Sequence, residues 1–352
     1  MIVRTVSPSP MDNLLGVSPT EAQTWLYRRK ETELAPRWCS PRLGMGAYQK
    51  HRAMLARWAF GLLHSGPLGK HGALVSPLVP HHALQLMDRV LSVTDLTAGV
   101  LHLALATCFW IAAKYDSEGC DDGTAGAEAL TAELLVEACG GTYSAQLMKR
   151  MEVQVLNVLR WRVTPATSAH FLRSFVAKED AGGAGGGDTG GEEPPRSTVE
   201  LLGGAQEAGQ VLNRLLRACT CDVQMLAFLP SQVAAGVLYV ARHGALTEAP
   251  RGSDPALASE EVWPAELAAI TEHSVEQLKY CIEGVKHAEA ALTDSRDCRA
   301  SGCSPRGPLE RLMGGGDSED EEEEEEEEEF GEGDGVEEEG EREEQEREEE
   351  DG

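Results

Sequence analysis

Apolar residues recur at helical spacing over two long stretches of the chain. Between about residues 49 and 177 they fall into at least four segments separated by breaks rich in Gly, Pro and Thr, and the pattern resumes from 199 to about 292. No segment alternates apolar and polar residues between hairpin turns, as a half-buried strand would. The pattern therefore predicts an all-α protein with two helical bundles.

Composition divides this pattern into parts. A Gly-rich stretch at 181–193, followed by Pro194 and Pro195, cannot sustain a helix and predicts a flexible linker. Ser-Pro pairs near the start predict an irregular leader. The predicted parts are a disordered leader (1–19), a first bundle (20–176), a Gly-rich linker (177–198), a second bundle (199–292) and a disordered tail (293–352).

Negative charge is concentrated at the end of the chain. The formal net charge is −28, and residues 317–352 contain 25 acidic and two basic residues, so −23 of that charge lies there. With almost no apolar side chain to bury, this acidic tail is expected to stay disordered through self-repulsion and to act as a solubilising extension. A basic partner is the alternative interpretation. DNA phosphates would repel the tail, so no direct nucleic-acid binding is expected at this end.

Several function classes are disfavoured by what the sequence contains. The longest apolar stretch, 100–113, is too short to span a bilayer, which predicts a buried core helix and no membrane association. The first residues lack a basic-then-apolar signal, which predicts a nuclear and cytoplasmic protein. Nine cysteines include no CxxC pair, so we expect buried free thiols in a reducing compartment. Without zinc-ligand spacing, a phosphate loop or a catalytic triad pattern, the sequence predicts no metal, no cofactor and no enzymatic activity.

Specific sequence motifs resemble those of the cyclin family. In the first bundle they are HRAMLARW (51–58), similar to the MRAIL motif, LMDRVLS (86–92), LALATCFWIAAKY (103–115), MEVQVLNVLRW (151–161) and PATSAHF (165–171). In the second bundle FLPSQVAA (228–235) and WPAEL (263–267) resemble the entry and the late helices of the second cyclin fold. The order of the motifs along both bundles makes the resemblance specific.

The resemblance implies tandem cyclin boxes of about five helices each and a non-catalytic regulatory subunit. Such a subunit binds a cyclin-dependent serine/threonine kinase and holds the kinase C-helix in its active position, at the G1/S or the mitotic transition. A transcription-type scaffold with two cyclin folds is the alternative, but its zinc ribbon and basic DNA-binding surface are missing from this sequence. The subtype stays open, because Trp161 with its neighbours resembles the D type and Trp263-Pro264 the A type.

By resemblance, the kinase-binding residues are Lys114, Glu152, Ile111, Tyr115, Leu156 and Val163. Lys114 ends an otherwise apolar helix, so its ammonium group must reach water or a partner, and Glu152 opens the face of another helix. In the family the charged pair bonds the kinase around its C-helix, and the four apolar residues form a pocket for a kinase side chain. A simple salt bridge within the bundle is the competing interpretation of the pair.

Two further sets of residues follow from the resemblance. Arg52 and Asp88 match a family pair that bridges two helices of the first box, which implies a structural role. The docking set matches an apolar patch on which some cyclins bind Arg-x-Leu segments of substrates and inhibitors, and it comprises Met54, Leu55, Trp58 and Leu101. Ordinary helix packing is the competing interpretation of these four residues. His51 and Arg57 add positive charge where a basic peptide is normally received, so we expect altered docking specificity.

Overall fold

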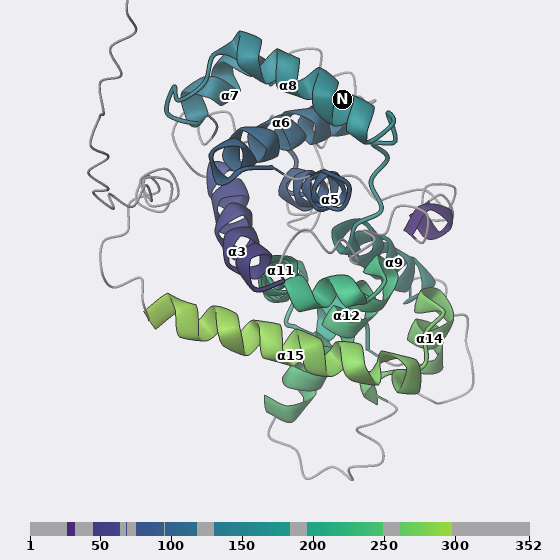
Figure 1. Cartoon of the computed structure of the whole chain (residues 1–352). Coiled ribbons are helices and arrows are strands. Elements are labelled where there is room, and N and C mark those ends of the chain that lie inside the picture. The colour runs from purple at the N-terminus through teal and green to yellow at the C-terminus, as the bar shows by residue number, and fades with distance from the viewer. Residues whose placement is uncertain are drawn as a thin grey trace, which may run out of the picture. The chain divides into compact units, whose positions relative to one another are not determined.

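The computed structural model describes residues 27–31, 45–63, 68, 75–94, 96–117, 130–183, 196–248 and 261–297. Within these ranges the regular structure is helical and contains no strand (Figure 1), which confirms the predicted all-α class. The first bundle contains α3 (Met45–Leu62), α5 (Val79–Leu91), α6 (Ala98–Ser117), α7 (Ala132–Ala138) and α8 (Ala145–Val158). The second contains α9 (Ser168–Gly183), α10 (Thr198–Leu201), α11 (Ala205–Cys221), the 3₁₀ helix η2 (Val223–Ala227), α12 (Pro230–Glu248), α14 (Ala265–Thr271) and α15 (Val275–Asp297).

Helix α6 forms the centre of the first bundle. Every residue from Leu101 to Ala113 is buried, because apolar side chains occupy all faces of this helix and none can be left toward water. The hydroxyl of Thr107 donates to the Leu103 carbonyl at 2.8 Å and is thereby satisfied inside the core. Helices α5 and α8 pack against α6. The predicted core helix is confirmed.

Local signals place α8 across α6. Ser144 caps the helix, its Oγ accepting from the Leu147 N–H at 3.1 Å, and satisfies a donor that the first turn would leave unpaired. In the turn before it, Gly140 and Gly141 adopt φ values of 78° and 71°, a left-handed conformation that favours glycine. The helical pattern is interrupted at these two glycines, where the chain reverses direction between α7 and α8.

The chain leaves α8 through a strained turn. Arg160 and Trp161 have φ values of 52° and 59°, and each such non-glycine residue costs about 1 kcal/mol or more. The residues that follow, 162–167, which we call the connector, are not helical and lead into α9. Side chains of α5 hold the backbone of this connector. Gln85 bonds the Ala166 carbonyl and N–H at 2.9 and 3.2 Å, and Arg89 donates to the Arg162 carbonyl at 2.7 Å.

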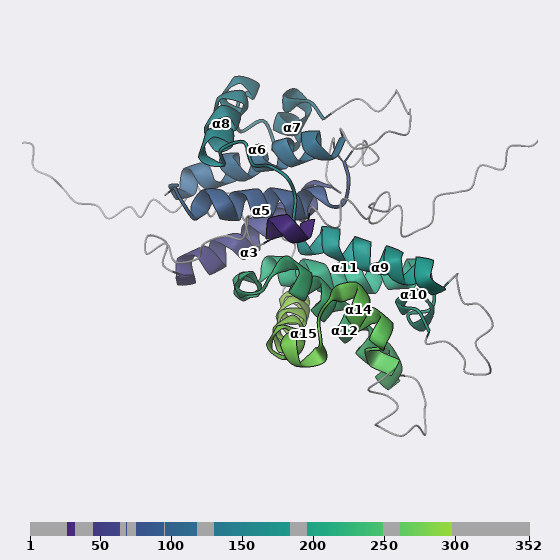
Figure 2. The same ribbon diagram turned by 90° about the vertical axis from the view of Figure 1, so that its right-hand side faces the viewer.

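The second bundle is built around α12, against which α9, α11 and α15 pack (Figure 2). At Gly236 a Cβ atom would lie 3.2 Å from Cys281 Sγ and 3.3 Å from a Val285 methyl carbon, so glycine permits the close approach of α12 and α15. The helical turn at 27–31 also packs on this bundle. Its Glu31 carboxylate accepts from the Ser231 N–H at 3.0 Å, at the start of α12.

The predicted domain boundaries differ from the observed elements at three places. Helix α9 crosses the boundary set at 176 and runs to Gly183, and its buried phenylalanines lie in the core of the second bundle. Helix α15 continues past 292 to Asp297. The turn at 27–31, assigned to the first part, contacts the second bundle. The leader, residues 184–195 of the linker and residues 298–352 of the tail lie outside the described residues. None of the described helices is long and apolar enough to cross a membrane.

A buried arginine connects several segments of the second bundle. Arg242 of α12 is 0% exposed. Its guanidinium group pairs with the Glu179 carboxylate at 2.9 Å and donates to the Thr198 hydroxyl and to the carbonyls of Arg196, Glu261 and Val262. These acceptors come from three separate segments. Arg242 thus ties α9, α10 and the start of the α14 region to the central helix.

We predict that Arg242→Met lowers the free energy of unfolding by about 3–5 kcal/mol, because it leaves the buried Glu179 carboxylate without its cation and several buried carbonyls without this donor. The matched control is Arg214→Met, since Arg214 pairs with Glu289 at 3.0 Å on the surface and should contribute about 1 kcal/mol or less. Urea unfolding followed by circular dichroism measures both. Equal effects of the two substitutions would contradict the role given to Arg242.

Candidate functional site

The cover over α6 ends at its C-terminal turn, where Lys114 stands. The side chain of Lys114 is 40% exposed and forms an ion pair with the Glu152 carboxylate of α8, which is 16% exposed. The ammonium nitrogen also lies 3.9 Å from the centroid of the Trp110 ring, one turn earlier, in a cation–π contact. The ion pair therefore spans the gap between the two helices at the rim of the core.

We call the six predicted kinase-binding residues, which include this pair, the α6–α8 patch (Ile111, Lys114, Tyr115, Glu152, Leu156 and Val163). The structure places Ile111 and Leu156 in the core, 4% and 9% exposed. Tyr115 is 36% exposed, and Val163 of the connector is half-buried against the same core. The accessible part of the patch thus consists of the charged pair, Tyr115 and Val163, with the two aliphatic residues beneath them.

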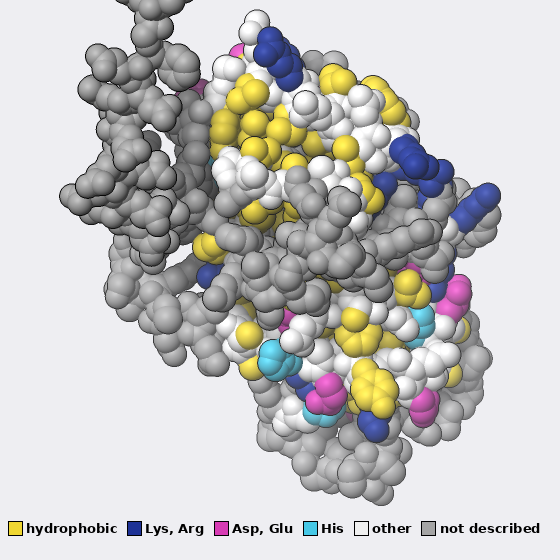
Figure 3. All heavy atoms as spheres, viewed as in Figure 1, with side chains coloured by type: hydrophobic (Ala, Val, Ile, Leu, Met, Phe, Trp, Pro, Cys, Tyr) yellow, Lys and Arg dark blue, Asp and Glu magenta, His cyan; other side chains and the backbone are white. Residues whose placement is uncertain are grey.

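Four of the six exposed large hydrophobic side chains among the described residues lie near the end of α6, on α8 or in the turn that ends α8, and the other two are Val93 and Tyr280. Among the described residues, Tyr115, Leu147, Val153 and Trp161 are 36%, 42%, 54% and 67% exposed. Three of them belong to α8 or the turn that ends it. Figure 3 shows hydrophobic side chains gathered over α6, α7 and α8 on the face it draws. Sequence periodicity did not single out Leu147 and Val153, because an outward apolar residue on a helix has no signature of its own. Grouped exposed apolar residues are typical of a protein-binding surface.

The predicted docking set is only partly accessible. Leu55 and Leu101 are buried in the core, 3% and 7% exposed, whereas Met54 and Trp58 are half-buried. The Trp58 ring lies edge-on to His102, with centroids 4.1 Å apart, and His102 Nδ1 is 3.1 Å from the Tyr143 hydroxyl. Peptide docking at this place stays a prediction, and Met54 and Trp58 would have to carry it.

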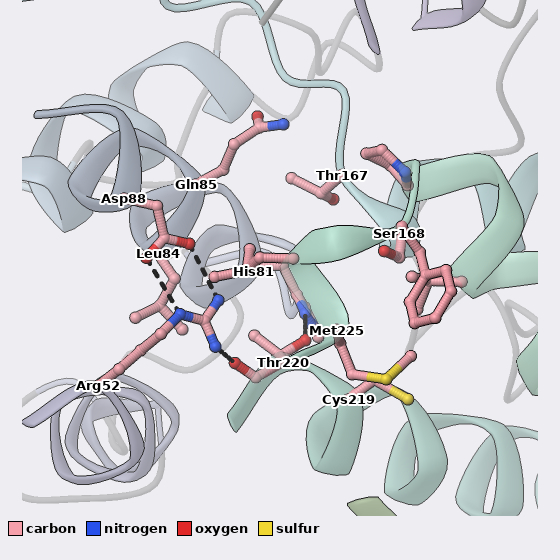
Figure 4. Close-up of a pocket in the computed structure, with 14 residues that line it drawn as sticks. Arg52, His81, Leu84, Gln85, Asp88, Thr167, Ser168, Cys219, Thr220 and Met225 are labelled. Carbon is pink, nitrogen blue, oxygen red and sulfur yellow. Dashed lines mark hydrogen bonds and ion pairs between the residues drawn. The ribbon is translucent and has the colours of Figure 1, made fainter. Parts of the chain in front are cut away.

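Arg52 joins three elements at the junction of the two bundles. Its guanidinium group makes two hydrogen bonds of 3.0 and 2.9 Å to the Asp88 carboxylate, with both side chains at least 96% buried. It also donates to the Thr220 carbonyl of α11 (Figure 4). His81 Nδ1 lies 2.9 Å from the Thr220 hydroxyl. The predicted link between α3 and α5 thus extends into the second bundle, beside a cavity of about 90 Å³.

Burial limits the reactivity of the described cysteines. The described cysteines are free thiols; Cys108, Cys139, Cys219 and Cys281 are buried and Cys221 is half-buried, as predicted. Burial raises the pKa of Cys139 and of Cys281 to about 12, which keeps both thiols protonated at neutral pH. Within the described ranges, no group of three or more His, Cys, Asp or Glu residues is placed to hold a metal ion.

Comparison with known proteins agrees with the geometry. The family model of the cyclin N-terminal domain matches residues 26–164, and that of the cyclin C-terminal domain matches 166–297, so the two meet within the connector. Together they cover well over half of the chain, and the chain therefore belongs to the cyclin family. Members of this family regulate cyclin-dependent kinases and are not enzymes themselves, which supports a kinase-regulatory role in general.

Individual relatives are distant. Cyclin-D of Ostreococcus tauri is 29% identical over 171 residues, which are 49% of this chain and 42% of the relative. Cyclin-B1-5 of Oryza sativa subsp. japonica is 24% identical over 247 residues, 70% of this chain and 44% of the relative. The chain thus spans less than half of the length of these two relatives. The crystal structure of a viral cyclin from herpesvirus saimiri aligns with a TM-score of 0.46 at 14% identity, covering 74% of this chain and 96% of that chain.

Four buried histidines predict acid sensitivity. Burial lowers the pKa of His81 to about 3, those of His82 and His102 to about 4, and that of His170 well below its ordinary value. Because these groups titrate near 6.5 in the unfolded chain, the unfolded state binds more protons below that pH. The stability they contribute is therefore present above pH 6.5 and is lost as the pH falls toward 4.

Between pH 7.5 and 5.5 we expect His81, His82 and His102 each to lower the free energy of unfolding by about 1.4 kcal/mol, and His170 to act in the same direction. Urea unfolding at the two pH values measures the sum, and His102→Gln should reduce the difference by its share. His243→Gln, at an exposed histidine, is the control and should leave the difference unchanged. A free energy of unfolding that is constant over this range would refute the prediction.

Proposed function

We propose that this chain is the regulatory subunit of a cyclin-dependent serine/threonine kinase in cell-cycle control, and that it activates the kinase by holding its C-helix in the active position. The observation that carries the proposal is the Lys114–Glu152 ion pair at the rim of the first core, with Tyr115 and Val163 accessible beside it. Such a place can offer hydrogen bonds and apolar contact to one helix at the same time.

The charged pair would bind the kinase through hydrogen bonds to its ammonium group and its carboxylate. An ammonium group has three donors and a carboxylate has two acceptor oxygens, so a single ion-pair contact does not use all of them. Charge-assisted bonds of this kind are stronger than neutral ones. Since the pair is only partly buried, a partner helix can reach it without the bundle opening.

The apolar residues would supply the remaining binding energy. Tyr115 is exposed and Val163 is half-buried, and Val153 of α8 and Trp161 in the turn that ends it also expose apolar surface. Interfaces of this type concentrate their binding energy in aromatic and aliphatic anchors beside satisfied polar groups. We place the kinase C-helix on this combined surface.

Activation would follow from selective binding to one kinase conformation. In protein kinases a Lys–Glu ion pair that involves the C-helix must form before the ATP phosphates are positioned. A subunit that binds only the inward C-helix shifts the kinase population toward that state by its differential affinity. The chain would contribute geometry and no catalytic group.

The test compares two double variants of equal charge change. Lys114→Ala/Glu152→Ala removes the pair in the patch. Lys149→Ala/Glu133→Ala removes a pair on the same bundle that is 3.2 Å long and more than half exposed on both sides. We expect the first variant to bind a cyclin-dependent kinase at least about 30-fold more weakly, as the loss of a binding hot spot does. The second should bind like the wild type.

Pull-down of the kinase, followed by a histone-kinase assay of the captured complex, measures both binding and activation. Thermal unfolding of the free variants checks that each is folded. Undiminished kinase capture and activity with Lys114→Ala/Glu152→Ala would refute the assigned surface.

A further inference from the structure

His82 of α5 lies directly beneath the α6–α8 patch. The residue is 0% exposed. Its Nε2 atom is 2.7 Å from the carbonyl oxygen of Val163, and its ring lies edge-on to that of Tyr115, with centroids 5.6 Å apart and an angle of 81°. Val163 and Tyr115 are the two apolar patch residues that reach the surface. One buried side chain therefore contacts both.

The hydrogen bond fixes the protonation state of the ring. Burial lowers the pKa of His82 to about 4; the Val163 carbonyl opposes this shift and the charge of Arg89 adds to it, so the imidazole is neutral at neutral pH. A carbonyl oxygen can only accept, and Nε2 must therefore carry the proton. Nδ1 is then an acceptor, and it is buried without a hydrogen-bond partner among the described residues.

Burial alone does not account for a histidine at this position. A leucine or methionine would fill a similar volume without leaving a polar nitrogen unpaired, and an unpaired buried acceptor costs stability. What a leucine could not supply is the N–H that holds the Val163 carbonyl. The polar contact is thus the property that distinguishes this residue from an ordinary core side chain.

Val163 depends on such contacts because it lies in the non-helical connector. The backbone on either side of it is held by the same face of α5, through Gln85 to Ala166 and through Arg89 to Arg162. His82, Gln85 and Arg89 stand at positions i, i+3 and i+7 of that helix. Of these three side chains, His82 also contacts Tyr115. It therefore links the connector to the end of α6.

We propose that His82 is a positioning residue for the partner: it holds the Val163 backbone and the Tyr115 ring in one arrangement, so that the α6–α8 patch is preformed before the kinase helix binds. The inference rests on the proposed function of that patch. Preformed surfaces bind more tightly because less conformational entropy is lost on association. Removal of His82 should therefore weaken binding even though the side chain never touches the partner.

The experiment measures the affinity of purified full-length variants for the cyclin-dependent kinase that the wild-type chain captures, together with the thermal midpoint of each free variant. His82→Met removes the hydrogen bond and should raise the Kd about tenfold, the amount one such bond is worth. His82→Gln carries an amide that can donate from nearly the same place, and it should restore the Kd to within about threefold of the wild type.

His81→Met is the matched control. His81 is the preceding residue and is also buried, but it bonds Thr220 at the junction of the two bundles, away from the patch. Its substitution should lower the thermal midpoint and leave the Kd unchanged. A merely structural role of His82 would make the His82→Met and His81→Met variants behave alike.

The outcomes separate the two proposals. If the wild-type chain binds no cyclin-dependent kinase, the proposed function fails. If the wild type binds and His82→Met binds equally well, the inference about His82 fails and the proposed function stands. If His82→Met does not fold, the affinities of His82→Gln and His82→Asn are compared instead. Only the longer side chain of glutamine can reach the Val163 carbonyl. Equal affinities of these two variants would overturn the inference.

Discussion

The structure depends on the burial of α6 from every side. A helix that is apolar on all faces must be covered completely, and α5 and α8 provide much of that cover. The cover ends where the helix becomes polar, at Lys114. The surface that we assign to the kinase is therefore located by the core itself, since the rim of the core is where a charged pair and half-buried apolar residues can stand together.

At the junction of the two bundles, buried polar contacts connect the first bundle to the second. The buried Arg52–Asp88 pair would be costly if either charge lost its partner, and Arg52 also binds the Thr220 carbonyl of α11. The start of α5 thus carries His81, which faces the junction, next to His82, which faces the patch. A substitution at Arg52 should disturb the α6–α8 patch indirectly, by destabilising the fold. Loss of kinase activation in such a variant would therefore not show that Arg52 contacts the kinase.

The helices and the two bundles could be read from the sequence, because apolar periodicity and the family motifs are local signals. The salt bridge between Lys114 and Glu152, which the structure forms, was only the competing interpretation of that pair. The sequence could not show which of the two bundles each helix joins. Helix α9 has the same periodicity whichever core it joins, and only packing assigns Phe171 and Phe175 to the second. Likewise Leu55 and Leu101 fit an exposed patch or a core equally well by spacing, and the structure buries both.

Contacts between distant residues were beyond sequence reasoning for a different reason. The bond from Arg52 to Thr220 joins residues 168 positions apart, and that from His82 to Val163 joins residues 81 apart. Both are made to backbone carbonyls, which every residue type offers, so no residue pattern marks the partner. The polar positions His82, Gln85 and Arg89 on one face of an otherwise buried helix are the signal that could have pointed to the connector.

Hydrogen–deuterium exchange of the 352-residue chain, with and without a bound cyclin-dependent kinase, tests whether the kinase binds at the α6–α8 patch. We expect the kinase to protect the backbone amides at the end of α6, along α8 and in the connector, and to leave those of α12 and α15 unchanged. Protection confined to the second bundle, with the amides around Lys114 and Glu152 exchanging as in the free chain, would contradict this expectation.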